Sequence, residues 1–166
     1  MAEALLITKQ DLVKFTALNG NLDPDKFIQF IKIAQDIHIQ RILGTKLLNK
    51  IKTDISGDDL VDPYLSLLTN YIKPMLIHWA MVEYLPYAAY TVSNGGVYKH
   101  SSENSETVVK EEVDFLVEKE RNTAESYTQR FLDQICYRQS EFPEYNQNSN
   151  GDVYPDSDNF TTGWVL

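Results

Sequence analysis

The sequence predicts an all-α protein with long central and C-terminal helices, a short hairpin-like excursion and an extended C-terminal tail. Three observations support this fold class. Apolar residues recur at three- and four-residue steps along most of the chain, the period of an amphipathic helix. The pairs Asp23-Pro24 and Asp62-Pro63 are typical helix starts, because Asp accepts from free backbone amides and Pro loses no bond at the first helical position. Alternation typical of strands is confined to the residues around Gly95-Gly96.

The N-terminal third reads as a series of helices. Thr8 and Asp11 form a capping-box-like start for a short helix from about Lys9 to Phe15. A second helix begins at Asp23-Pro24, presents an apolar stripe as far as Ile42, and ends at Gly44, which can adopt a left-handed conformation. A further short helix is expected from Thr45 to about Lys52, followed by a polar loop over 53–61.

The middle of the chain predicts a long apolar helix and then a hairpin. The helix starts at Asp62-Pro63, and we expect a bend near Pro74 and a stop near Pro86, because an internal proline removes a backbone hydrogen bond. The hairpin-like loop covers 91–102, where glycines supply positive φ. We expect the tip of this loop to be an interface, formed by Asn94, Gly95, Gly96 and Val97.

The last helix, from about Thr107 to Gln139, has the clearest pattern. One apolar seam repeats at helical spacing, and only Glu120 breaks it; the seam comprises Val109, Val113, Leu116, Glu120, Ala124, Tyr127, Phe131 and Ile135. Such a helix spans about 50 Å at about 1.5 Å per residue, whereas a chain of this length has a radius of gyration of about 15 Å. We therefore expect part of the seam to pack on another chain, through Val109, Val113, Leu116, Glu120 and Tyr127.

These patterns divide the chain into a helical domain, 1–140, and a tail, 141–166, that is extended or disordered until it is bound. From residue 139 on the chain contains no Lys or Arg. The tail ends in an apolar tip that is suited to docking on a partner, with Phe160, Trp164, Val165 and Leu166 as its interface residues. The alternative is that the tip folds back onto the chain's own core.

Charge is unevenly distributed over the 166 residues. The formal net charge is -9, with +3 on residues 1–52, -4 on 101–139 and -5 on 140–166. This balance argues against a protein that neutralises the phosphates of nucleic acid. The basic N-terminal segment of one copy can pair with the acidic C-terminal segments of another copy, or either can pair with an oppositely charged partner. The alternative is that both are simply solvated surfaces.

No constellation for chemistry is present, so we predict that the protein is not an enzyme and holds no cofactor or metal. His38, His78 and His100 fit no metal-ligand motif, and Gly95-Gly96 lacks the rest of a phosphate-binding loop. The run Asn146-x-Asn148-x-Asn150-Gly151 matches only the first half of a calcium loop. A single cysteine excludes an internal disulfide. We also expect no targeting segment and no membrane span.

Several segments together resemble the head-to-tail connector proteins of tailed bacteriophages, the adaptor or head-completion proteins, especially the ring-forming adaptors of phages of gut Bacteroidales. The similarity extends over about 5–145 and is a pattern of apolar, capping and turn positions. The segments that carry it are 7–12, 22–28, 33–35 with 42–44, 65–90, Gly95-Gly96-Val97, and Arg121-Asn-Thr-Ala-Glu-Ser-Tyr127. The tail after Asn146 has no counterpart in the resemblance.

The resemblance implies a structural virion protein at the head-tail junction, made in the host cytoplasm. Its subunits would form a ring, commonly of twelve, between the portal protein and the next connector or tail protein. The ring would extend the DNA channel and take part in genome packaging and ejection, with DNA passing through without specific binding. Channel-lining candidates are Glu106, Glu111, Glu112 and Glu118, with Glu120 beside them.

Two other readings remain open. One is a helical protein-interaction or regulatory domain of phage origin, which would be a monomer or dimer rather than a ring. The other is an enzyme with a site that the motifs do not reveal. Rings in solution or on a portal would favour the adaptor, and a reproducibly bound metal or nucleotide would favour the enzyme.

Overall fold

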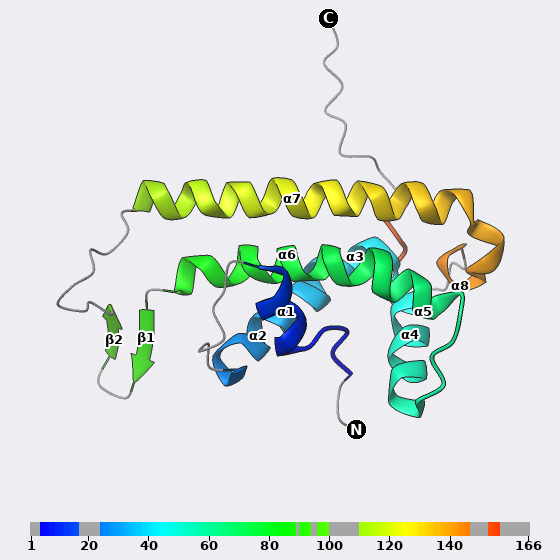
Figure 1. Ribbon diagram of the computed structural model, residues 1–166, viewed down its shortest axis with the longest axis horizontal. Helices are drawn as coiled ribbons and strands as arrows, with labels where there is room; N and C mark the ends of the chain where they lie inside the picture. Colours follow the sequence, from blue (N-terminus) through cyan, green and yellow to red (C-terminus); the bar gives the residue numbers. More distant parts are fainter. Residues whose placement is uncertain are drawn as a thin grey trace, which may run out of the picture.

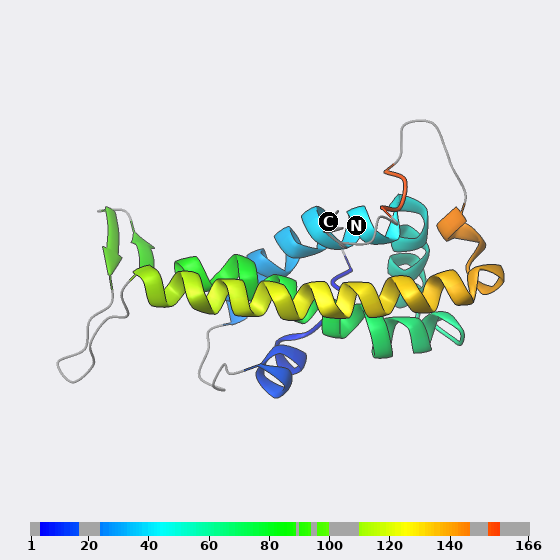
Figure 2. The same cartoon turned by 90° about the horizontal axis from the view of Figure 1, so that it is seen from above.

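One long helix, α7 (Lys110–Tyr137), runs the length of the molecule above the other elements (Figure 1). This arrangement is seen in a computed structural model, which describes residues 4–16, 24–88, 90–93, 96–99, 110–146 and 153–156. Helix α6 (Lys73–Tyr84) lies beneath α7 and antiparallel to it. Seen from above, α1 (Lys9–Phe15) lies on one side of this pair, and α2 (Pro24–Ala34) with α3 (Gln40–Leu43) lies on the other (Figure 2).

The all-α prediction is confirmed, and several predicted boundaries agree with the structure. Helix α1 begins after a capping box in which the Asp11 N–H donates to Thr8 Oγ1 and the Thr8 N–H donates to Asp11 Oδ2. Helix α2 begins at Pro24, and α3 ends at Gly44, whose φ of 76° suits a glycine. Between α2 and α3 a π-helical turn, η1 (Gln35–Ile39), keeps the chain helical.

Helix α4 (Thr45–Gly57) is longer than expected, so the loop predicted over 53–61 was wrong for its first five residues. Two contacts prolong the helix. Lys50 Nζ donates to Asp54 Oδ1 at 2.7 Å, one turn away, and Ile55 packs against the core. The helix ends where Asp58 takes a left-handed conformation with φ 56°.

The central apolar helix forms as α5 (Tyr64–Leu67), the π-helical turn η2 (Leu68–Ile72) and α6. Where we expected a bend near Pro74, the structure has this π-helical turn just before it. The turn avoids a clash between the ring of Pro74 and the carbonyl four residues earlier. At Pro86 the helix gives way to the 3-10 turn η3 (Leu85–Tyr87), as predicted.

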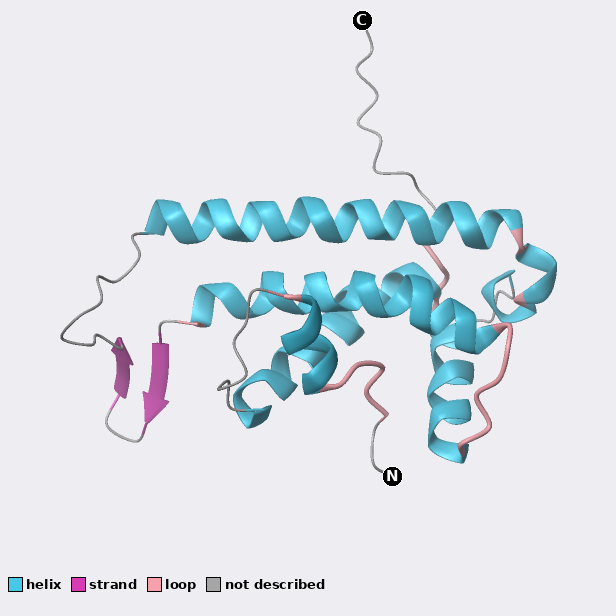
Figure 3. Cartoon of the chain, viewed as in Figure 1, coloured by secondary structure: helices cyan, strands magenta, loops and turns pink. Residues whose placement is uncertain are grey.

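The expected hairpin consists of β1 (Tyr90–Ser93) and β2 (Gly96–Lys99), which pair antiparallel with Val92 opposite Val97. It stands at the end of the molecule away from α4 and α5 (Figure 3). At the other end, a 3-10 turn, η4 (Gln139–Glu141), leads from α7 into α8 (Pro143–Asn146). Phe142 and Tyr145 are buried in the main core, so the helical body continues past the boundary expected at residue 140.

Candidate functional site

The C-terminal half of α7 is the half that completes the core. Ala124, Phe131 and Ile135 are fully buried, seven and four residues apart, on the face that the seam predicts. Thr128 is buried with them, donates to the Ala124 carbonyl and accepts from the Trp79 indole Nε1 at 3.2 Å. This half therefore finds its partner within the chain, on α6.

The N-terminal half of α7 is different. Val113 and Val117 are half-buried, whereas Leu116 is 46% exposed and Phe115 is 66% exposed. Glu111, Phe115 and Glu118 follow one another at four- and three-residue steps, so they share a face of the helix. All three are exposed, and we call them the acidic stripe. An exposed phenyl ring between carboxylates is the kind of surface that a second molecule can cover.

Two residues of the predicted long-helix interface are engaged inside the chain instead. His78 Nδ1 donates to Glu120 Oε2 at 2.7 Å, and the His78 ring stacks on Tyr127 with centroids 5.3 Å apart. Glu120 breaks the apolar seam because it faces a histidine of α6. Of the remaining interface residues, Leu116 is exposed, Val113 is half-buried and Val109 lies outside the described residues.

A second histidine on the opposite side of α6 makes the same kind of contact. His38, in the π-helical turn η1, stacks on Trp79 with centroids 4.0 Å apart and donates from Nε2 to Glu83 Oε1 at 2.8 Å. His78 thus links α6 to α7, and His38 links η1 to α6. Sequence reasoning missed both pairs, because the partners are 42 and 45 residues apart and no local pattern joins them.

A cavity of about 520 Å³ opens between α1, α6 and α7. Its lining combines cations with apolar and aromatic side chains, including Lys14, Phe15, Lys73, Ile77, Tyr127 and Arg130. We call it the basic groove. A separate cavity of about 320 Å³ lies on the other side of α6. Its lining includes two arginines and three carboxylates: Arg41, Arg121, Glu83, Glu125 and Asp156.

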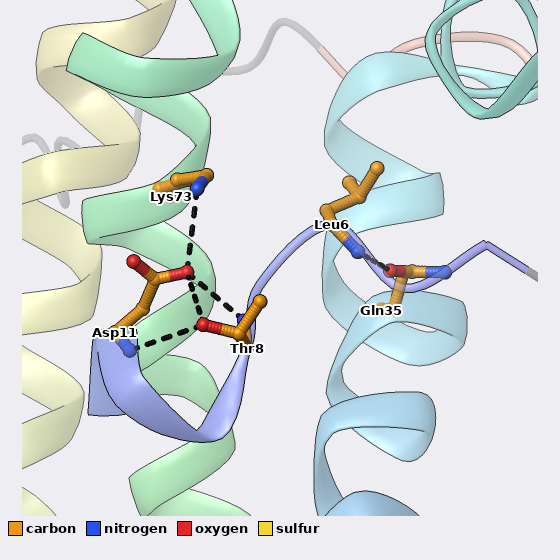
Figure 4. A network of polar contacts seen from close by, with 5 residues as sticks. All are labelled: Leu6, Thr8, Asp11, Gln35 and Lys73. Carbon is orange, nitrogen blue, oxygen red and sulfur yellow. Dashed lines mark hydrogen bonds and ion pairs between the residues drawn. The ribbon is translucent and has the colours of Figure 1, made fainter. Parts of the chain in front are cut away.

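Helix α1 contributes Asp11, Lys14 and Phe15 to the basic groove. Figure 4 shows the polar contacts of Asp11 with Thr8 and Lys73. Lys73 Nζ lies 3.3 Å from Asp11 Oδ2, the same oxygen that accepts from the Thr8 N–H. Burial opposes ionisation of Asp11, but the backbone hydrogen bond from Thr8 and the charge of Lys73 outweigh it and hold its pKa below the ordinary value. Figure 4 also shows how buried Gln35 holds the segment that precedes α1: its Oε1 accepts from the Leu6 N–H at 3.0 Å.

A short piece of the predicted tail packs on the body of the protein. The Thr45 N–H donates to the Val153 carbonyl at 3.0 Å, and the Asp156 N–H donates to the Arg41 carbonyl at 2.9 Å. Pro155 is buried against Gly44, where an added Cβ would lie 2.7 Å from the proline ring. Residues 153–156 therefore form a strap over the joint between α3 and α4, on the same face as the 320 Å³ cavity.

The remaining predicted site residues are placed as follows. Glu111, Glu112 and Glu118 are exposed on α7, and Gly96 and Val97 begin β2. Asn94, Gly95 and Glu106 lie outside the described residues, as does the tail tip formed by Phe160, Trp164, Val165 and Leu166. The predicted roles of these residues stay predictions.

Within the described ranges, no group of three or more His, Cys, Asp or Glu side chains is arranged to hold a metal ion. Among the same residues, no helix is both long and apolar enough to cross a membrane.

Residues 39–155 match the model of a protein family described as a family of unknown function, DUF6712. The chain belongs to this family. The DUF6712 match begins at the end of η1 and runs through both cavity walls on α6 and α7 to Pro155 of the strap. It leaves out α1 and α2, so the Lys14 side of the basic groove lies outside the matched region. No curated protein and no solved structure matches the chain significantly.

Proposed function

We propose that the protein is a structural virion protein that forms a ring between the portal and the tail of a bacteriophage and extends the DNA channel. The observation that carries this proposal is the N-terminal half of α7. It presents Phe115 and Leu116 to solvent on a helix that the described part of the chain covers only on the side of α6. Such a surface is suited to a neighbouring subunit, because burial of apolar side chains drives association.

The sequence resemblance to phage adaptors supports the same proposal. It extends over about 5–145 and includes both the α7 segment from Arg121 to Tyr127 and the hairpin. Charge supports it too, since subunits in a ring meet through two different faces that must complement each other. A chain with +3 on its first 52 residues and -4 on 101–139 has such faces available.

Exposed carboxylates on α7 fit a channel for DNA. Glu111, Glu112 and Glu118 are on the solvent side of the helix, whereas Glu120 turns inward to His78. A lumen lined by carboxylates repels phosphates and lets DNA slide rather than bind. We therefore assign the channel role to some of the first three residues and not to Glu120.

The decisive experiment is a cryo-EM reconstruction of the intact particle, together with mixing of the purified protein and its portal protein. We expect a ring at the portal with at least one of Glu111, Glu112 and Glu118 toward the lumen. A ring in which all three lie in subunit contacts would contradict the channel role. A protein that stays a monomer or dimer with the portal present, and is missing from the particle, would contradict the adaptor and favour a phage regulatory domain.

A further inference from the structure

The basic groove has positive charge that the described part of the chain does not neutralise. Among the described residues, Lys14 and Arg130 form no ion pair: Lys14 Nζ lies 5.2 Å from the centroid of the Phe15 ring, and Arg130 lies over Tyr71 at 5.0 Å. Of the three cations, only Lys73 has a carboxylate partner among the residues that the structure describes, and that partner is Asp11. In a chain of net charge -9, this groove is a local site for an anionic group.

The groove is also apolar enough to hold an aromatic ring. Phe15 is 57% exposed at its edge, and Ile77 and Tyr127 line it. A ligand that carried only charge would leave this apolar surface uncovered. The lining therefore favours a ligand that combines carboxylates with a large apolar side chain.

The acidic stripe has that composition. Phe115 is flanked by Glu111 one turn before it and Glu118 one turn after it, and all three are exposed on α7. The stripe and the groove are on different faces of α7. Tyr127 and Arg130 line the groove, whereas Glu118 is two turns before Glu125 on the same face, and Glu125 lines the cavity on the other side of α6. One copy can thus offer its stripe while its groove accepts another.

We infer that the acidic stripe of one copy of this chain binds the basic groove of the next. Phe115 covers the apolar lining, and Glu111 and Glu118 pair with Lys14 and Arg130. The contact joins two different surfaces, so repetition gives a ring when the rotation closes. This inference rests on the proposed function for the presence of neighbouring copies, and it names the contact between them.

A charge-exchange experiment tests the contact directly. One double variant, Glu111→Lys with Glu118→Lys, reverses the stripe and keeps the groove; the other, Lys14→Glu with Arg130→Glu, reverses the groove and keeps the stripe. Each variant alone brings like charges together, so we expect its self-association to weaken at least about tenfold relative to the wild type. The mixture restores both pairings, so it should assemble as an alternating 1:1 oligomer with an even number of subunits.

Native mass spectrometry and sedimentation at low and high salt measure these outcomes, and circular dichroism checks that both variants fold. Wild-type assembly should weaken at high salt, since the groups lie near the surface. Variants that assemble as well as the wild type, or a mixture that does not assemble, would overturn the contact. So would a wild-type chain that stays monomeric at a subunit concentration of about 1 mM, where even a millimolar contact is populated.

Failure of this contact is distinguishable from failure of the proposed function. Virion rings that tolerate both double variants would overturn the contact and leave the adaptor role intact. Pairing of the two variants in solution, with the protein absent from virions, would support the contact and overturn the adaptor role.

Discussion

The two halves of α7 have the same apolar periodicity but different surroundings. In the half after Glu120, the seam packs on α6, Phe131 contacts Tyr145 of α8, and Ala124, Phe131 and Ile135 are completely buried. In the half before it, Val113 and Val117 are half-buried and Phe115 lies on the outer face. Periodicity thus shows which face of a helix is apolar, but the elements placed beneath it decide whether that face is covered.

The largest effect should come from a matched pair of phenylalanine substitutions in the two halves. Phe131→Ala removes a fully buried ring and should lower the free energy of unfolding by about 3–5 kcal/mol. Phe115→Ala removes an exposed ring and should change it by less than about 0.5 kcal/mol. Urea unfolding of both variants measures the difference, and equal losses of stability would show that the two halves are covered alike.

The next effect concerns Glu120, the residue at the boundary between the halves. Glu120→Ala leaves His78 without its carboxylate partner and should cost about 1 kcal/mol. Glu118→Ala, two residues earlier and exposed, is the matched control and should cost nothing measurable in stability. If the two variants unfold at the same urea concentration, the contact between Glu120 and His78 does not stabilise the fold.

A pH-dependent effect is expected below α7, at the edge of the basic groove. The pKa of the Asp11 carboxyl is lowered in the folded protein. The ionised carboxylate therefore stabilises the fold fully above its ordinary pKa of 3.8, and this stabilisation is lost as the pH falls through the lower pKa of the folded state. Asp11→Ala should therefore cost about 1 kcal/mol at pH 6, including the lost cap, and less at pH 3. Urea midpoints at the two pH values, with Glu111→Ala as the control, measure this. A cost that does not shrink at pH 3 would contradict a role for the ionised carboxylate.

The smallest effect on stability is expected from the tail. Deletion of 160–166 removes Phe160 and Trp164 and should leave the unfolding midpoint unchanged while it weakens assembly, because this tip is predicted to dock on a partner. Double replacement of Thr161 and Thr162 by serine keeps the apolar tip and should assemble normally. Unchanged assembly of the deletion variant would refute a partner role for the tip.

Much of the fold could be predicted because its signals are local. The capping box of Thr8 and Asp11, the prolines at 24 and 86 and the glycine at 44 all act within one helical turn. The seam of α7 is also local, since it depends only on helical spacing.

The candidate site was less predictable because it depends on contacts between distant residues. Glu120 looks like an interruption until His78 is placed opposite it, and Lys14 and Arg130 share a groove only because α1 and α7 flank α6. The strap at 153–156 contains no motif that indicates its contact with Gly44. Helix α4 is also longer than predicted, because Ile55 packs against the core although the residues around it are polar.

The strap also limits where the apolar end of the chain can act. Val153 and Asp156 are hydrogen-bonded at the joint of α3 and α4, which fixes the origin of the residues that follow. Trp164 is eight residues beyond Asp156. Because an extended chain advances at most about 3.5 Å per residue, the Cα of Trp164 stays within about 28 Å of the Cα of Asp156, and the indole can meet a receptor at most one side-chain length beyond that distance.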